Sequence, residues 1–213
     1  QDHLEEPPLY RYCAETLLAT TENSVNTIKA ELDSLGDSLV INRSPSNLKI
    51  HVHTNDPLTM SNRLKQFGKI THQKIDSTKA QWEAVHAKKG SIALVTDSSA
   101  DLPIELIERE QIQVFPLKIR LGDHHLLDRL TIDLPELYQK VHHENTSANS
   151  SAPSAETISR HLSFLAQHYD SIIVLTLSSH LSSTYQLMAS SAAKITNKKI
   201  TVIDSCTCLL YTS

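Results

Sequence analysis

The sequence predicts an α/β chain in two parts, a ferredoxin-like βαββαβ domain followed by a doubly wound parallel sheet. Apolar residues before Gly90 follow strand and helix spacing in the order that a βαββαβ fold requires. After Gly90, short continuous apolar segments alternate with helical segments, as parallel strands covered by helices do. The chain has 213 residues, of which 39% are hydrophobic and 21% charged, so it can bury a core.

The first part, residues 1–89, is expected to form a split βαβ sandwich with a linking helix at its end. Gly36 and Gly68 close the two helices of the sandwich, and Asp56 followed by Pro57 marks the start of the second helix. In chain order the expected elements are a strand over 10–19, a helix over 24–35, a hairpin of strands 38–42 and 47–54, a helix from 57, a strand over 70–75 and the linking helix 78–89.

The second part, residues 90–207, is expected to place its ligand beyond the carboxyl ends of its parallel strands. A hairpin is expected at Gly122, and residues 208–213 are interpreted as a truncated or non-native tail. In chain order the expected elements are a strand over 92–95, a helix from about 103, a strand over 114–121, a polar loop over 144–154, a helix over 155–168, a strand over 172–177, a helix over 184–196 and a strand over 200–203.

The composition disfavours several classes of protein. The formal net charge is −4 and the lysine pairs at 88–89 and 198–199 are isolated, so nucleic acid is not the expected partner. The four glycines lack the spacing of dinucleotide-binding and P-loop motifs, so no nucleotide site is expected. No apolar segment is long enough to span a membrane. Three cysteines fit a reducing cytosol better than a disulfide framework, and a cytoplasmic location is expected.

Hydroxyl groups are concentrated in three loops at the predicted ligand edge of the parallel sheet: 96–99, 150–154 and 178–184. The third loop precedes a helix N-terminus, where backbone N–H groups and the helix dipole favour an anion. His180 is the only basic residue in these loops. A singly charged head group, such as a carboxylic acid, is therefore expected rather than a triphosphate. The alternative is that these serines only cap helices and close turns.

Five segments resemble the DegV fatty-acid-binding family in order and spacing: Leu94–Pro103, Val114–Leu117, Ser150–Ser154, Leu177–Gln186 and Val202–Ser205. This resemblance implies that Ser150 and Ser182 hold an acyl carboxylate. Ser151, Thr184 and Ser98 complete the expected fatty-acid-binding set.

Three positions depart from the pattern of that family. Ser150 replaces a threonine and keeps the hydroxyl, Ala152 lacks the amide of a glutamine, and Ser183 adds a Cβ where glycine permits close approach. The family continues into a second lobe that closes over the acyl tail, which residues 208–213 do not resemble. Since the chain also begins with Gln1, we expect a fragment truncated at both ends, with an incomplete DegV-type lobe.

The sharpest motif of the first part is His51-Val52-His53. Alternate residues of a strand face the same side, so both imidazoles are expected on the open face of the sheet. The first and third strands of a βαββαβ sheet are antiparallel neighbours, which brings Cys13 close to these histidines. The set predicts a three-ligand zinc site with an open fourth position, and Glu15 is an outer partner or a fourth ligand. The alternative is two exposed histidines and a buried cysteine.

Three motifs of the first part resemble the non-kinase region of the large, FakA-type fatty acid kinase protein: Tyr12–Glu15, Gly36–Val40 and Lys49–Pro57. The resemblance covers residues 10–87 and implies that Cys13, His51 and His53 bind zinc. It also implies that an ATP-binding, DhaL-type kinase domain lies upstream as a partner.

The leading functional hypothesis is a lipid carrier joined to a kinase-associated domain. It would bind a long-chain fatty acid and present the carboxylate for acyl phosphate formation in phospholipid synthesis. A second hypothesis is a zinc hydrolase at the predicted metal site, with Glu15 or Asp56 as the base. A third, a serine hydrolase using Ser182 with His180, lacks the nucleophile-elbow pattern. The oligomeric state is left open, a homodimer included.

Overall fold

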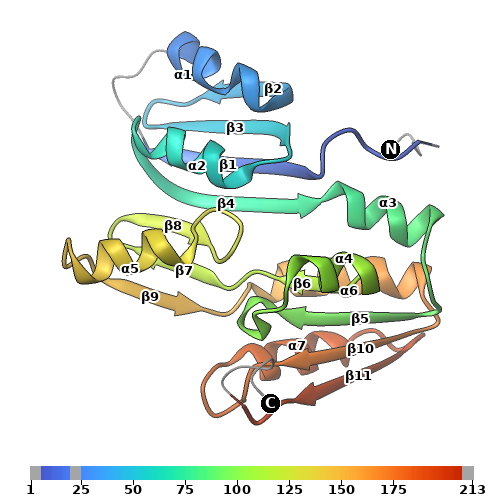
Figure 1. Cartoon of the computed structure of the whole chain (residues 1–213). Coiled ribbons are helices and arrows are strands. Elements are labelled where there is room, and N and C mark those ends of the chain that lie inside the picture. The colour runs from blue at the N-terminus through green and yellow to red at the C-terminus, as the bar shows by residue number, and fades with distance from the viewer. Residues whose placement is uncertain (1–5, 20–24, 208–213) are drawn as a thin grey trace. The chain divides into compact units, whose positions relative to one another are not determined.

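The computed structural model describes residues 6–19 and 25–207, and its packing divides the chain into two compact units (Figure 1). The first unit comprises residues 1–82 and 118–150, and the second comprises 83–117 and 151–213. The units therefore alternate along the chain rather than following one another. The expected tail at 208–213 lies outside the described residues.

The first unit is built on a four-stranded antiparallel sheet in the order β2-β3-β1-β4, which is the strand order of the predicted βαββαβ fold. Its elements are β1 (Tyr12–Ala19), α1 (Val25–Leu32), η1 (Asp33–Leu35), β2 (Gly36–Arg43), β3 (Asn47–Thr54), α2 (Pro57–Lys65) and β4 (Lys69–Ser77). The helix α3 (Thr78–His86) follows and ends three residues earlier than expected.

Alternation along the strands separates the two faces of this sheet. Ile50 and Val52 of β3 are almost fully buried and join the core formed with α1 and α2, whereas the histidines on either side of Val52 are only half-buried. The helix α2 starts as predicted, because the Asp56 carboxylate accepts a hydrogen bond of 2.9 Å from the Thr59 N–H and Pro57 occupies the first helical turn. The opposite, open face of the sheet carries these two histidines.

A second, three-stranded sheet completes the first unit, in the order β8-β7-β9. Its elements are β7 (Lys118–Leu121), β8 (His124–Leu127), α5 (Leu134–His142) and β9 (Ala148–Ser151). The predicted hairpin at Gly122 is confirmed, with φ of 55° at the turn.

Two expectations for this region were wrong. The single strand expected over 114–121 is two strands, since Pro116 has no N–H for a sheet ladder and interrupts it. The polar loop expected over 144–154 contains the strand β9, which pairs with β7.

The second unit contains the predicted parallel sheet, in the order β11-β10-β5-β6 with all three pairings parallel. Its elements are β5 (Ile92–Asp97), η2 (Ser98–Ala100), α4 (Ile104–Glu110), β6 (Gln113–Phe115), α6 (Ala155–His168), β10 (Ser171–Thr176), α7 (Thr184–Ala192) and β11 (Lys199–Asp204). Val95, Val174, Leu162 and Met188 are among its buried core residues. Within the described part of the chain, no helix has the length and apolar character needed to cross a membrane.

Candidate functional site

A candidate metal centre lies on the open face of the antiparallel sheet. In the register of β1 and β3, Cys13 pairs with His53 and Glu15 pairs with His51. The Cys13 Sγ lies 3.9 Å from His51 Nδ1, and the two imidazole centroids are 5.1 Å apart. One ligand atom from each of the three predicted ligands lies within 4.8 Å of the others. The predicted convergence of Cys13, His51 and His53 is therefore confirmed.

Carboxylates flank both imidazoles of this cluster. Glu15 Oε1 lies 3.9 Å from His51 Nδ1, and Asp37 Oδ1 on β2 lies 3.4 Å from His53 Nδ1. A carboxylate next to one ring nitrogen orients an imidazole and favours the other nitrogen as the metal ligand, which is the arrangement of Asp37 and His53. In His51, Nδ1 instead faces both Glu15 and the Cys13 Sγ, each at 3.9 Å. Glu15 was predicted as such an outer partner, whereas Asp37 was missed, because its neighbour on β3 depends on the strand register.

The electrostatic environment keeps the metal-free cysteine protonated. Burial is the largest cause that raises the pKa of the Cys13 thiol, and the negative charges of Asp76 and Glu15 raise it further, against the opposing Lys74. A metal ion would reverse this balance, because it binds the thiolate and adds positive charge beside the two carboxylates.

The donor set fits zinc in its chemistry. Zinc prefers thiolate and imidazole ligands, and tetrahedral bonds of 2.0–2.3 Å place neighbouring ligand atoms about 3.3–3.8 Å apart. The three ligand atoms lie within 4.8 Å of one another, which exceeds this spacing by at most about 1–1.5 Å. Of the two acidic residues considered as a general base, Asp56 is engaged as the cap of α2, and Glu15 pairs with Lys49 at 3.2 Å.

The hydroxyl-rich loops of the second unit are organised by a buried carboxylate at the end of β5. Asp97 is 0% exposed and accepts hydrogen bonds from the Ser99 N–H at 3.0 Å and the Leu177 N–H at 2.9 Å. The Ser99 hydroxyl also donates to it. This carboxylate therefore joins the carboxyl ends of two neighbouring parallel strands, β5 and β10. Its role was missed because the sequence does not show that residues 80 positions apart are in contact.

The expected carboxylate-binding hydroxyls of this unit lie at the N-terminus of α7 and after β5. Ser182 Oγ is 2.8 Å from Thr184 Oγ1 and accepts a hydrogen bond from the Thr184 N–H at 3.2 Å. Ser98 is 5% exposed, and its Oγ accepts a hydrogen bond of 3.0 Å from the Leu117 N–H. These serines thus make the local turn and cap contacts of the alternative interpretation, which leaves their role toward a ligand a prediction.

The remaining two predicted hydroxyls lie at the end of β9. Ser150 and Ser151 are both exposed, and the division between the compact units falls between them. Ser150 belongs to the first unit and Ser182 to the second, so the convergence of these two side chains stays a prediction. Ser154, three residues further on, caps α6 by accepting a hydrogen bond from the Thr157 N–H.

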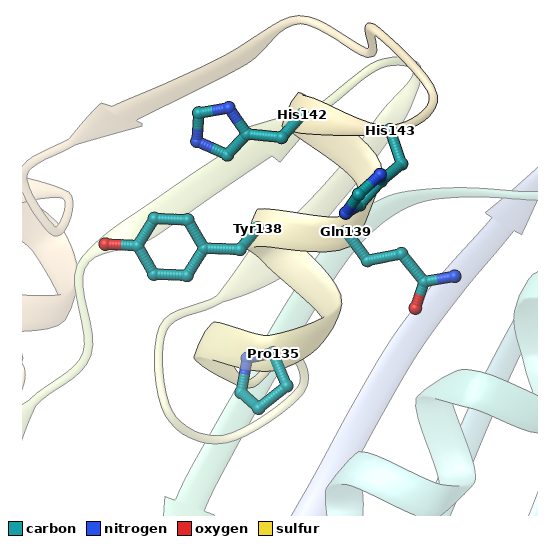
Figure 2. Close-up of a pocket in the computed structure, with 5 residues that line it drawn as sticks. All are labelled: Pro135, Tyr138, Gln139, His142 and His143. Carbon is teal, nitrogen blue, oxygen red and sulfur yellow. The ribbon is translucent and has the colours of Figure 1, made fainter.

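A shallow hollow on α5 holds none of the predicted site residues. Figure 2 shows its five lining residues projecting from this helix and its C-terminal end: Pro135, Tyr138, Gln139, His142 and His143. The Tyr138 and His142 rings stack with centroids 5.8 Å apart, and both histidines are exposed. In a second pair of adjacent histidines, on β8, His125 is exposed, whereas His124 is half-buried and accepts a hydrogen bond of 3.2 Å from the Ile70 N–H.

Relatives of known sequence match the second part of the chain. A DegV domain-containing protein of Clostridium acetobutylicum is 36% identical over 115 residues, which are 54% of this chain and 40% of that protein. Protein DegV of Bacillus subtilis is 29% identical over 54% of this chain and 41% of its own length. The chain thus spans about two fifths of the length of these relatives.

Solved structures support the same assignment. DegV of Bacillus subtilis, described as a fatty acid binding protein, superposes with a TM-score of 0.54 and 28% identity over 57% of this chain and 43% of its own. A DegV family protein of Thermus thermophilus, described by its fatty acid binding, gives a TM-score of 0.50 and 33% identity over 54% of this chain and 40% of its own.

Family models divide the chain as the motifs do. Residues 9–85 match the FakA-like middle domain of fatty acid kinase proteins. Residues 91–211, more than half of the chain, match the model of the uncharacterised DegV family. The chain therefore belongs to the DegV family, and its DegV domain follows a FakA-like middle domain.

Proposed function

We propose that this chain binds a long-chain fatty acid and presents its carboxylate to a fatty acid kinase domain. The observation that carries the proposal is the pairing of a DegV domain with a FakA-like middle domain in one chain. Solved DegV proteins of two bacteria are described as binding fatty acids, which gives the ligand class. The FakA-like domain gives the partner class, because it is the middle part of a fatty acid kinase protein.

In this proposal the head group binds at the hydroxyl-rich edge of the parallel sheet. Ser182 and Ser150 donate hydrogen bonds to the carboxylate, with Ser151 next to the second of these. Thr184 and Ser98 hold the loops, as their contacts with Ser182 and the Leu117 N–H support. Residues 178–184 contain neither Lys nor Arg, so the charge is balanced by hydroxyl and backbone donors and by the N-terminus of α7.

The proposed role of the first unit is to hold zinc with Cys13, His51 and His53. A bound zinc ion would supply a Lewis acid that polarises a phosphoryl oxygen, or it would fix β1 and β3 as a structural ion. Asp37 would then hold the His53 imidazole in the orientation that binds the metal, as its distance of 3.4 Å from Nδ1 supports, and Glu15 would lie beside His51 as an outer partner.

Lipid binding is tested by extracting the purified protein for mass spectrometry and then titrating the delipidated protein with palmitate. Ser182→Ala is expected to weaken palmitate binding about tenfold to a hundredfold, as loss of one hydrogen bond to a charged group does. Ser190→Ala is the matched control, because this exposed serine lies on α7, the helix that follows Ser182, and bonds only to the Leu187 carbonyl among the described contacts. No fatty acid in the extract together with no palmitate binding would overturn the proposal.

Metal binding is tested by measuring zinc per chain in the wild type and in His51→Ala and His53→Ala. The wild type is expected to hold one zinc ion and both variants to lose it. His72→Ala is the control, since His72 is an exposed histidine on β4 of the same sheet. Equal zinc content in all four proteins would refute the site.

A further inference from the structure

One segment of the chain belongs to the DegV domain by sequence and to the FakA-like domain by packing. Residues 118–150, which form β7, β8, α5 and β9, lie inside the DegV match of 91–211. They nevertheless form one compact unit with residues 1–82. The DegV domain is therefore divided, and the part that ends at Ser150 packs on the FakA-like sheet.

Apolar side chains of this segment complete the core of the FakA-like domain. Four of them are 1–8% exposed and lie in one cluster with the residues of α2 and β4: Ile119, Leu121, Leu126 and Ile132. From the FakA-like side, Leu64 of α2 and Ile70 of β4 are fully buried in the same cluster. The segment 118–150 and the FakA-like domain therefore share one continuous apolar core.

Polar contacts at the rim of this interface give it specificity. The Ile70 N–H on the edge strand β4 donates a hydrogen bond of 3.2 Å to His124 Nδ1 on β8. Lys65 Nζ on α2 lies 2.6 Å from Glu136 Oε1 on α5, and both side chains are largely covered, at 15% and 22% exposure. Because β4 is an edge strand, the sheet itself offers no acceptor to this N–H, and the His124 ring nitrogen supplies it.

We propose that α2 and β4 form the docking surface by which the FakA-like domain recognises a DegV domain, and that the segment 118–150 is the recognised element. Acid releases this segment by protonating His124. The link to lipid binding rests on the proposed function, because the segment carries Ser150 at its end. The residue before β9 bonds to the turn of the β7–β8 hairpin, because the Gly122 N–H donates to the Ser147 carbonyl at 2.8 Å. Docking thus positions the strand that bears one of the expected head-group hydroxyls.

The acid sensitivity follows from the groups around His124. Burial is the largest cause that lowers its pKa below 6.5, and Lys65 and Lys140 lower it further, against Asp123 and Glu136. Lys69, on β4, is neutralised by Asp123 at 2.6 Å. The neutral ring accepts the Ile70 hydrogen bond, and protonation of Nδ1 replaces that acceptor with a donor. Docking is therefore complete above pH 6.5 and weakens as the pH falls through the lowered pKa.

Hydrogen-exchange mass spectrometry of the full chain tests the docking. In His124→Ala and in Lys65→Met, amides of 118–150 are expected to exchange about tenfold faster, as loss of one buried hydrogen bond implies, while β10 is unchanged. His125→Ala, which replaces the exposed histidine next to His124, and Lys29→Met, which replaces an exposed lysine of α1, are the matched controls. In the wild type the same amides are expected to exchange faster at about pH 5.5 than at about 7.5, after correction for the intrinsic rate, and this difference disappears in His124→Ala.

The result that would overturn the docking surface is exchange in His124→Ala and Lys65→Met that matches their controls. Exchange that increases equally in β10 would overturn it too, because it would show general destabilisation. Palmitate titration of His124→Ala tests the link to the lipid separately and is expected to show weaker binding. If the wild type binds no palmitate, the proposed function fails while the exchange experiment still decides the docking surface.

Discussion

Replacing Asp97 tests whether one buried carboxylate holds the hydroxyl-rich edge of the parallel sheet together. The carboxylate is 0% exposed and accepts from two backbone N–H groups, those of Ser99 and Leu177. In Asp97→Ala both donors lose their acceptor, at about 1–3 kcal/mol each, so the second unit is expected to lose about 2–6 kcal/mol of stability. In Asp97→Asn only one oxygen is replaced, and the expected loss is about half as large.

The assay has to report the second unit alone, because a chain of two compact units need not unfold in one step. Hydrogen exchange of β10 peptides in increasing urea gives the opening free energy of that unit. Asp170→Asn is the control, since this exposed aspartate precedes the same strand, and a change within about 0.5 kcal/mol is expected there. If Asp97→Ala costs less than about 1 kcal/mol, the carboxylate does not organise this edge and the reasoning fails.

Two further predictions concern the metal centre. Gly36→Ala would place a Cβ 1.8 Å from the carbonyl oxygen of His53, so we expect the free energy of unfolding to fall by about 1–3 kcal/mol or more and zinc to bind more weakly. Urea unfolding and metal titration measure the two effects. Gly90→Ala is the control and should change neither, because nothing lies within 4 Å of its added Cβ. The raised pKa of Cys13 means that the thiol is protonated at neutral pH in the metal-free protein, so zinc binding should release its proton and weaken about tenfold per pH unit as the pH falls. Competition titrations between about pH 7 and 8.5 measure this slope, which Cys13→Ser should reduce; an unchanged slope would contradict the role of the thiolate.

The metal centre could be predicted because it depends on local periodicity and on one rule of topology. Alternation places His51 and His53 on the same face, and the βαββαβ order makes β1 and β3 antiparallel neighbours. The packing of 118–150 could not be predicted in this way. Alternation shows that Ile119 and Leu121 are buried, yet it does not show against which sheet, because that choice depends on contacts between residues far apart in the chain.

The donors at the hydroxyl-rich edge suit the carboxylate of the proposed ligand better than the acyl phosphate that the kinase would make. A saturated tail of about sixteen carbons contributes about 11 kcal/mol when its methylene groups are buried, whereas one hydrogen bond to a carboxylate contributes about 1.5–3 kcal/mol. Tail burial therefore dominates affinity, and the serines decide which head group is accepted. Hydroxyl donors and a helix N-terminus suffice for one negative charge, but residues 178–184 offer no Lys or Arg for the added charge of an acyl phosphate. In the proposed function, phosphorylation would thus weaken the head-group contacts while leaving the tail unchanged, and the product would leave more easily than the acid it came from.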